Sequence, residues 1–198
     1  MIAQNRMKEL KFSHITKTAG TSIEDAAKSC GILWGRHHMV GGVYWHDPIV
    51  TIPSETRSLY DWFIVVRNPY DRIVSEYFCP WMGSCKGTPT VQQFNETIRA
   101  NINRRLTFRR HSGGGHYMEQ WRYMDPSVVV HVLHFEELST AFPALMNTYG
   151  LSVRLDAIRN KGRPKQFSVN DLDATTIRLI NEVYQKDFEL FGYTMRSP

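Results

Sequence analysis

The feature that most constrains the fold is a pair of strand–turn–helix segments whose basic residues lie 50 positions apart. The first carries Lys17-Thr18-Ala19-Gly20-Thr21-Ser22 after a short apolar stretch, and the second carries Arg67-Asn68-Pro69 after the apolar run 62–66. Each places cationic and hydroxyl side chains near the start of a helix, where free N–H groups and a partial positive charge attract phosphate. Two such segments in one small domain predict a ligand with phosphates at two separate positions.

The first segment predicts a strand over residues 10–15, because its apolar residues partly alternate. Gly20 is expected to let the backbone approach a ligand closely. Thr21 and Ser22 are good N-cap residues, and their hydroxyls can donate to phosphate. Lys17 precedes the glycine by three residues, whereas a Walker A motif places its lysine at the helix start. This order argues against an ATP or GTP site of the usual type.

The second segment predicts a strand buried on both faces, because residues 62–66 are continuously apolar and rich in β-branched and aromatic types. Asn68 and Pro69 fit an N-cap followed by proline in the first helical turn. Arg67, at the carboxyl end of the strand, suits bidentate binding of a phosphate. Ser75, about two turns into the helix, is expected to face the same anion. The alternatives are an arginine paired with a carboxylate of the following helix, and a serine that only packs.

Composition predicts one domain spanning residues 1–198. A chain of 198 residues with 42% hydrophobic content can build a single core. Strand-like and helix-like stretches alternate, which is typical of an α/β fold with a mostly parallel central sheet flanked by helices. The clearest helices are expected over 90–106 and, with an apolar stripe facing the core, over 172–191. No apolar run is long enough to predict a membrane span.

Charge and cysteine content exclude several classes of protein. The net charge of +5 is modest and its basic residues are dispersed, which suits an anionic cofactor and argues against a nucleic-acid partner. Three cysteines without a CxxC pattern predict a reducing compartment and no metal site. A disulfide between Cys79 and Cys85 is the less favoured alternative. Trp81, Trp121 and Tyr123 are candidates for lining an acceptor pocket.

Together these segments resemble the PAPS-dependent sulfotransferases, in particular the carbohydrate-type branch known as sulfotransferase family 2. Two further stretches fit that family: residues 128–138, a late strand with a Phe-Glu-x-Leu turn, and residues 183–193 near the C-terminus. The four stretches follow the family order over most of the chain. The resemblance implies a P-loop-like sulfotransferase fold and transfer of a sulfuryl group from 3′-phosphoadenosine-5′-phosphosulfate (PAPS) to a hydroxyl, with the bisphosphate PAP as product and without a metal.

The resemblance also implies roles for individual residues. The 5′-phosphosulfate is expected to bind to the first loop, formed by Lys17, Thr18, Ala19, Gly20, Thr21 and Ser22. Lys17 would neutralise charge that develops on the leaving phosphate. Arg67 and Ser75 are expected to hold the 3′-phosphate. A later loop would cover the nucleotide with Lys161, Gly162 and Arg163, the alternative being a solvated basic loop.

A general base is needed because the acceptor hydroxyl must lose its proton. Relatives use a histidine or a carboxylate between the two phosphate motifs, where this chain offers His37, His38, His46, Asp47 and Glu55. His46 is favoured because it lies 21 residues before Arg67, near the histidine of many relatives, and imidazole titrates at about 6.5. His38 ranks second, while His37 and Glu55 stay open. A purely structural His46 is the alternative.

The leading hypothesis is therefore a sulfotransferase acting on a hydroxyl of a sugar or other small hydroxylated molecule. A P-loop-type small-molecule kinase is the second reading, against which the position of Lys17 and the lack of an acidic Mg²⁺ ligand after a strand both argue. A non-catalytic nucleotide- or polyanion-binding module is the third. The N-terminal residues lack an apolar signal core. The expected location is thus the cytoplasm, or the Golgi lumen if the chain was cut from a longer one. The sequence does not indicate an oligomeric state.

Overall fold

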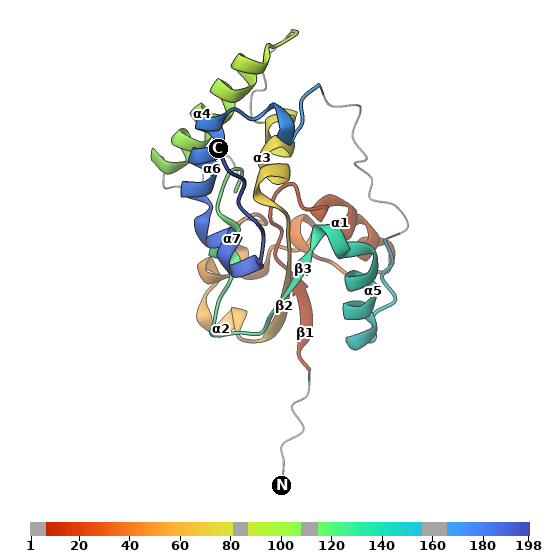
Figure 1. Cartoon of the computed structure of the whole chain (residues 1–198). Helices are drawn as coiled ribbons and strands as arrows, with labels where there is room; N and C mark the ends of the chain where they lie inside the picture. The colour runs from red at the N-terminus through yellow and green to blue at the C-terminus, as the bar shows by residue number, and fades with distance from the viewer. Residues whose placement is uncertain (1–6, 81–86, 108–114, 156–165) are drawn as a thin grey trace.

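A parallel three-stranded sheet forms the centre of the molecule (Figure 1). The computed structural model describes residues 7–80, 87–107, 115–155 and 166–198. In these residues the strands β1 (Glu9–Phe12), β2 (Tyr60–Val66) and β3 (Val130–His134) lie in the order β1-β2-β3, and both neighbouring pairs are parallel. The predicted α/β fold with a parallel sheet is confirmed. Because the strands are parallel, the loops that follow them leave from one edge of the sheet.

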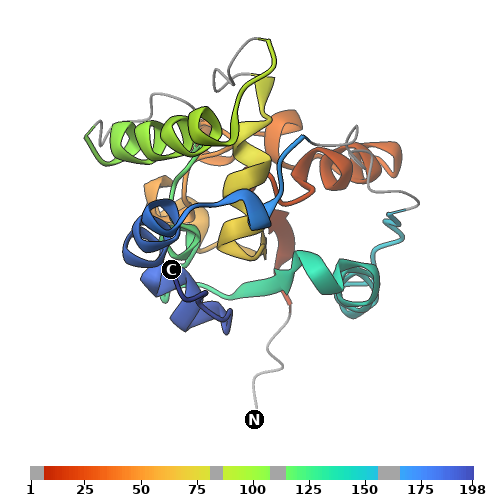
Figure 2. The same ribbon diagram turned by 45° about the horizontal axis from the view of Figure 1, so that its top comes forward.

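The two faces of β2 pack against different layers, as a fully buried strand requires. Phe63 and Val65 share a core with the helices α1 (Gly20–Ser29) and α5 (Leu138–Thr148), which lie together on one side of the sheet in Figures 1 and 2. Trp62, Ile64 and Val66 face the other layer, which includes the short helix η3 (Ile49–Thr51). The prediction that residues 62–66 form a strand buried on both faces is confirmed.

A further group of helices packs beside the sheet (Figure 2). It contains α3 (Pro69–Tyr77), α4 (Val91–Thr107), α6 (Ala174–Val183) and α7 (Gln185–Phe191) around one shared core. The helix expected over 90–106 is confirmed as α4. The single helix expected over 172–191 is wrong, because the chain leaves helical geometry at Tyr184. The buried Tyr184 hydroxyl donates to the carbonyl of Tyr117 at 2.7 Å, which ties the break to another segment.

Short helical turns occur between these elements: η1 (Gly35–His37), η2 (Val40–Gly42), α2 (Ser54–Arg57), η5 (Gln120–Tyr123), η6 (Phe135–Glu137) and η7 (Val169–Asp171). The strand predicted over 10–15 is shorter than expected and ends at Phe12. Ile15 is nevertheless fully buried, so the apolar pattern indicated its burial correctly although the strand ends before it. Within the described ranges, none of the helices is long and apolar enough to cross a membrane.

One buried carboxylate joins the last helix to the edge of the sheet. Asp187 of α7 accepts hydrogen bonds from the backbone amides of Gln120 (2.9 Å) and Trp121 (2.8 Å). The Gln120 side chain in turn bonds both the amide and the carbonyl of Arg67, each at 2.9 Å. Burial raises the pKa of Asp187, although the two amides oppose the shift. Asp187 therefore supports the strand end that carries Arg67.

Replacing this carboxylate tests the connection. Asp187→Ala should lower the free energy of unfolding by about 2–4 kcal/mol, because two buried amides lose their acceptor. Glu189→Ala, at an exposed position of the same helix, should change it by less than about 0.5 kcal/mol. Urea unfolding of both variants measures the difference, and an Asp187→Ala protein as stable as the wild type would contradict this account.

Candidate active site

The two motifs singled out in the sequence lie side by side at the carboxyl edge of the sheet. Because β1 and β2 are parallel neighbours, the loop after β1 and the turn after β2 leave the sheet together. Nη1 of Arg67 donates to the backbone carbonyl of Lys17 at 3.3 Å, which joins the two loops directly. Two basic loops from segments 50 residues apart in the sequence therefore lie next to each other in the fold.

The loop after β1 has the backbone shape of an anion site. Lys17 (φ 65°) and Ala19 (φ 70°) both adopt the left-handed conformation, and such alternation turns successive amides toward one concave side. Among the described residues, no acceptor bonds the amides of residues 17–21. The start of α1 at Gly20 adds the partial positive charge of a helix N-terminus. This loop can therefore bind a phosphate or sulfate group through its backbone.

The hydroxyl side chains of this loop differ from their predicted use. Ala19, rather than Thr21 or Ser22, occupies the cap position of α1, and no side chain caps the helix. The predicted N-cap is therefore wrong, because the left-handed turn at Ala19 starts the helix earlier. Thr18 is fully buried and donates to the carbonyl of Ile15 at 2.7 Å, so its hydroxyl closes the turn. Thr21 stays partly exposed.

Gly20 has a reason for being glycine that the sequence did not reveal. The ring of His14 lies where a Cβ at this position would be, so any side chain there would collide with it. His14 Nδ1 lies 2.8 Å from Oε1 of Glu24, and a Cβ on Gly35 would collide with that same carboxylate. Both partners are almost wholly buried. Burial raises the pKa of Glu24 to about 7 and lowers the pKa of His14 to about 3.

His46, the favoured base, lies against this pair. It is 7% exposed, and its ring centroid is 4.4 Å from that of His14. Nδ1 of His46 lies 3.0 Å from the carbonyl oxygen of His14 and must donate to it, since a carbonyl only accepts. Nε2 is consequently the unprotonated nitrogen. Burial, helped by repulsion from His14, lowers the pKa of His46 to about 3, so the ring is neutral near neutral pH.

The other candidates for the base lie elsewhere. His38 and Glu55 are exposed, and neither forms a hydrogen bond, ion pair or ring contact with His14 or His46 in the described structure. His37 faces Asp25 at 3.6 Å. Tyr123, proposed from the sequence as an acceptor contact, is fully buried and donates to the His46 carbonyl at 2.6 Å. Its position is structural and fixes the backbone of His46.

Thr16, Arg72 and Glu76, which sequence reasoning did not assign to the site, complete the cluster together with His116. Arg72 is fully buried and donates to Thr16 and to the carbonyl of Met118. It also lies 3.7 Å from Oε1 of Glu76. Glu76 accepts from the Thr16 hydroxyl and, at 2.5 Å, from Nδ1 of His116. The sequence did carry a signal for Arg72 and Glu76. These two charged residues are four positions apart on the buried face of α3, where apolar residues are usual.

Electrostatics keep Glu76 ionised despite its burial. Desolvation alone would raise its pKa, but the hydrogen bond from His116 and the charges of His116 and Arg72 outweigh desolvation and lower it. The ring of His116 lies 6.2 Å from that of His46. The structure brings three imidazoles, from residues 14, 46 and 116, around the loop that follows β1.

The guanidinium of Arg67 is available to a ligand. Its guanidinium stacks over Phe135 at 4.3 Å, and the described residues provide no carboxylate that forms an ion pair with it. Burial lowers its pKa, an effect that Asp71 and Glu136 partly offset. The alternative in which Arg67 pairs with a carboxylate of α3 is not observed, because Glu76 pairs with Arg72. Ser75 lies on α3, 8% exposed.

Some predictions concern residues beyond the described ranges. Lys161, Gly162 and Arg163 lie outside the described residues, as do Trp81 and Cys85. Trp121 is half-buried under two cations, with Lys186 Nζ 3.7 Å and the Arg122 guanidinium 4.8 Å from its ring.

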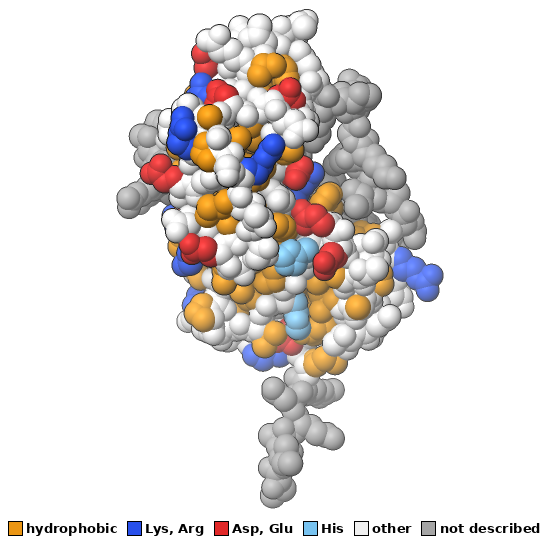
Figure 3. Space-filling view, viewed as in Figure 1, with side chains coloured by type: hydrophobic (Ala, Val, Ile, Leu, Met, Phe, Trp, Pro, Cys, Tyr) orange, Lys and Arg blue, Asp and Glu red, His pale blue; other side chains and the backbone are white. Residues whose placement is uncertain are grey.

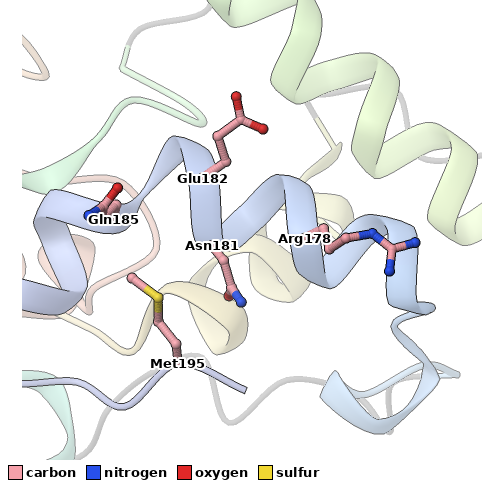
Figure 4. Close-up of a pocket in the computed structure, with 5 residues that line it drawn as sticks. All are labelled: Arg178, Asn181, Glu182, Gln185 and Met195. Atoms are coloured by element: carbon pink, nitrogen blue, oxygen red, sulfur yellow. The ribbon is translucent and has the colours of Figure 1, made fainter. Parts of the chain in front are cut away.

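A pocket elsewhere on the surface is separate from this cluster. Its volume is about 380 Å³. It is lined by Arg178, Asn181 and Glu182 of α6, by Gln185 of α7 and by Met195 near the C-terminus (Figure 4). None of these residues belongs to the two loops. On the face shown in Figure 3, basic side chains of the described residues alternate with acidic ones instead of forming one stripe. This face therefore lacks the electrostatic footprint expected of a nucleic-acid site.

The low pKa of His46 predicts that acid destabilises the fold. Between about pH 6.5 and 3 the unfolded chain protonates this histidine and the folded protein does not, so stability falls as pH falls, by about 1.4 kcal/mol per pH unit. The opposite shifts of Glu24 and His14 cancel near pH 5–6, roughly, because that pair holds one proton in either state. Between about pH 5 and 6, where that pair cancels, His46→Gln should remove the slope in urea unfolding, and the exposed His38→Gln should keep it. An unchanged slope in His46→Gln would contradict the burial of a neutral His46.

Comparison with known proteins agrees with this geometry. A model of the sulfotransferase family (family 2) matches residues 50–194, which is well over half of the chain. The matched region includes β2, Arg67, α3 and the C-terminal helices, whereas the loop at residues 17–22 precedes it. No curated protein and no solved structure gives a significant match. The family match shows that the chain belongs to sulfotransferase family 2, whose activity is sulfuryl transfer.

Proposed function

We propose that the protein transfers the sulfuryl group of PAPS to a hydroxyl of a sugar or another small hydroxylated acceptor. The observation that carries the proposal is the contact between Arg67 and the Lys17 carbonyl. This contact places Arg67 beside the loop after β1. Among the described residues, Arg67 has no ion-pair partner and the loop amides have no hydrogen-bond acceptor. Family membership supports sulfuryl transfer, and the two adjacent anion sites support a donor with two separated phosphate positions.

In this proposal the loop after β1 binds the 5′-phosphosulfate. Its inward amides and the N-terminus of α1 hold the non-bridging oxygens. Lys17, at the left-handed position of the loop, neutralises the charge that develops on the leaving phosphate as the sulfur–oxygen bond breaks. Arg67, with Ser75, holds the 3′-phosphate in a bidentate manner. Transfer of this kind depends on positioning and charge neutralisation, as phosphoryl transfer does.

His46 serves as the general base in this proposal. Its Nδ1–H is held by the His14 carbonyl, which leaves Nε2 to accept the proton of the acceptor hydroxyl. An imidazole with a pKa near 3 is a weak base, but an anionic donor bound beside it raises that pKa toward the working range. His14 and His116 are the imidazoles from which this role must be distinguished by experiment.

Donor recognition is tested by calorimetric titration with PAP, AMP and ATP. Arg67→Ala should weaken PAP binding about 10–100-fold, because a charge-assisted hydrogen bond to the 3′-phosphate contributes about 1.5–3 kcal/mol. AMP, which lacks that phosphate, should bind the variant and the wild type alike. Arg178→Ala, at an exposed arginine of α6, is the matched control and should bind PAP normally.

Two results would overturn the donor assignment. If ATP binds as tightly as PAP, the kinase reading gains support. If Arg67→Ala leaves PAP affinity unchanged, the second phosphate site lies elsewhere.

Catalytic roles are tested by PAP release from PAPS with a panel of mono- and disaccharides. Lys17→Ala should lower kcat about 10²–10³-fold and weaken PAP binding far less, whereas exposed Lys28→Ala at the other end of α1 should match the wild type. His46→Asn should lower kcat about 10²–10⁴-fold. A larger loss in His14→Asn than in His46→Asn would transfer the base role to His14. Loss of affinity without any turnover in the wild type would indicate a binding module.

A further inference from the structure

Three side chains with different metal-binding chemistry meet below the loop that follows β1. A carboxylate oxygen of Glu76, the thiol of Cys79 and a ring nitrogen of His116 all lie within 4.8 Å of one another. Glu76 and Cys79 are buried, and His116 is partly exposed. The cysteine pattern of the sequence predicted no metal site. It could not reveal this group, which contains a single cysteine and whose histidine lies 37 positions after Cys79 in the chain.

The backbone holds these three residues in place. Glu76 and Cys79 are three residues apart at the end of α3, and the amide of Cys79 donates to the carbonyl of Glu76 at 2.8 Å. His116 follows Gly115, whose positive φ of 80° sets the turn and whose carbonyl accepts from Met118. The Met118 carbonyl is in turn bonded by the buried Arg72 at 2.7 Å. The group is therefore built on rigid, buried structure.

The two oxygens of Glu76 have separate partners. Oε1 faces Arg72 and the Thr16 hydroxyl, whereas Oε2 accepts from Nδ1 of His116. A cation could thus bind Oε2 and the imidazole while Oε1 keeps Arg72 and Thr16. In the metal-free protein the hydrogen bond between His116 and Glu76 holds both ligands close to the required position.

We propose that Glu76, Cys79 and His116 bind a thiophilic divalent cation, with Zn²⁺ the best match. Thiolate, imidazole and carboxylate are the ligands zinc prefers, whereas Mg²⁺ and Ca²⁺ favour sets made only of oxygen. Zinc–ligand bonds of about 2.0–2.3 Å at tetrahedral angles place ligand atoms about 3.3–3.5 Å apart. The present group reaches that spacing by shifts of about an ångström. The ionised Glu76 and a Cys79 thiolate balance the charge of the cation. Binding releases the thiol proton and also removes the proton that lies between His116 Nδ1 and Glu76 Oε2, which frees both atoms to bind the cation.

Three protein ligands leave the fourth tetrahedral position for water or another small ligand, as in zinc sites that are not purely structural. The ion would lie next to Thr16, which directly precedes Lys17, and near His46, whose ring is 6.2 Å from that of His116. The inference concerns the protein without donor or acceptor. It therefore stands or fails independently of the proposed sulfuryl transfer.

Cobalt titration of the metal-free protein tests this site, because a thiolate bound to Co²⁺ gives a near-ultraviolet charge-transfer band. The wild type should bind one Co²⁺ with this band, and added Zn²⁺ should displace it. Cys79→Ser should lose the band, whereas Cys30→Ser, at an exposed cysteine after α1, should keep it. Circular dichroism checks that each variant is folded.

A second variant keeps the test decisive if Cys79→Ser is unstable. His116→Asn should weaken Co²⁺ binding by at least about 100-fold, because even an outer-shell partner of a metal contributes about 10–100-fold. Zn²⁺ should also raise the melting temperature of the wild type and of Cys30→Ser but not of the ligand variants. Absence of the band in the wild type, its persistence in a folded Cys79→Ser, or its loss in Cys85→Ser alone would overturn the proposal.

Discussion

The buried guanidinium of Arg72 is the interaction on which the candidate site depends. It bonds the loop after β1 through Thr16, the segment after Gly115 through Met118, and its own helix through Glu76. Removing one member of a buried ion pair costs about 3–5 kcal/mol, since the other charge is left uncompensated. Here such a loss would also release two carbonyl groups. The segments that contain Thr16, Arg72 and Met118 therefore depend on the hydrogen bonds of this one side chain for their relative positions.

Two arginines five residues apart thus have opposite roles. Arg72 lies inside α3, where every donor it uses is directed at protein oxygen. Arg67 lies at the strand end, held by its backbone through Gln120, with its guanidinium stacked on Phe135 and turned toward the Lys17 loop. A phosphate ligand requires a fixed arginine whose guanidinium is not already paired with a carboxylate, and among the described residues Arg67 meets both conditions. The loop after β1 shows the same division: within the described residues its amides have no hydrogen-bond acceptor, whereas the Thr18 hydroxyl donates to the Ile15 carbonyl.

The histidine cluster shows how burial determines chemistry. His14 and His46 are buried, and desolvation there favours the neutral ring. His116 lies closer to solvent and to the carboxylate of Glu76, which supports a proton on its Nδ1. Imidazoles from three distant segments therefore present different nitrogen atoms in one place. Such a cluster can accept a proton at one ring and coordinate a cation at another, which is why both proposals arise from neighbouring residues.

Hydrophobic pattern, turn residues and motif order could be read from the chain itself. They determined the parallel α/β sheet, the burial of β2, the Asn68 cap, which accepts from the Tyr70 amide at 3.0 Å, and the family. These features are local or repeat with a fixed period, so the physical chemistry of short segments decides them. Local signals also misled where long-range contacts prevailed. The expected helix breaks at Tyr184, whose hydroxyl bonds the Tyr117 carbonyl, and Gly20 makes room for the His14 ring as well as for any ligand.

Only the tertiary structure decided which charged residues are partners. Glu76 pairs with Arg72 instead of Arg67, His46 rather than His38 lies against His14, and His116 meets Glu76 and Cys79. Each choice depends on which segments the sheet and its helices bring within a few ångströms, and on the desolvation that follows. Sequence spacing does not encode those quantities. The chain by itself thus determined the framework and the family, and folding in three dimensions determined the electrostatic environment in which its side chains act.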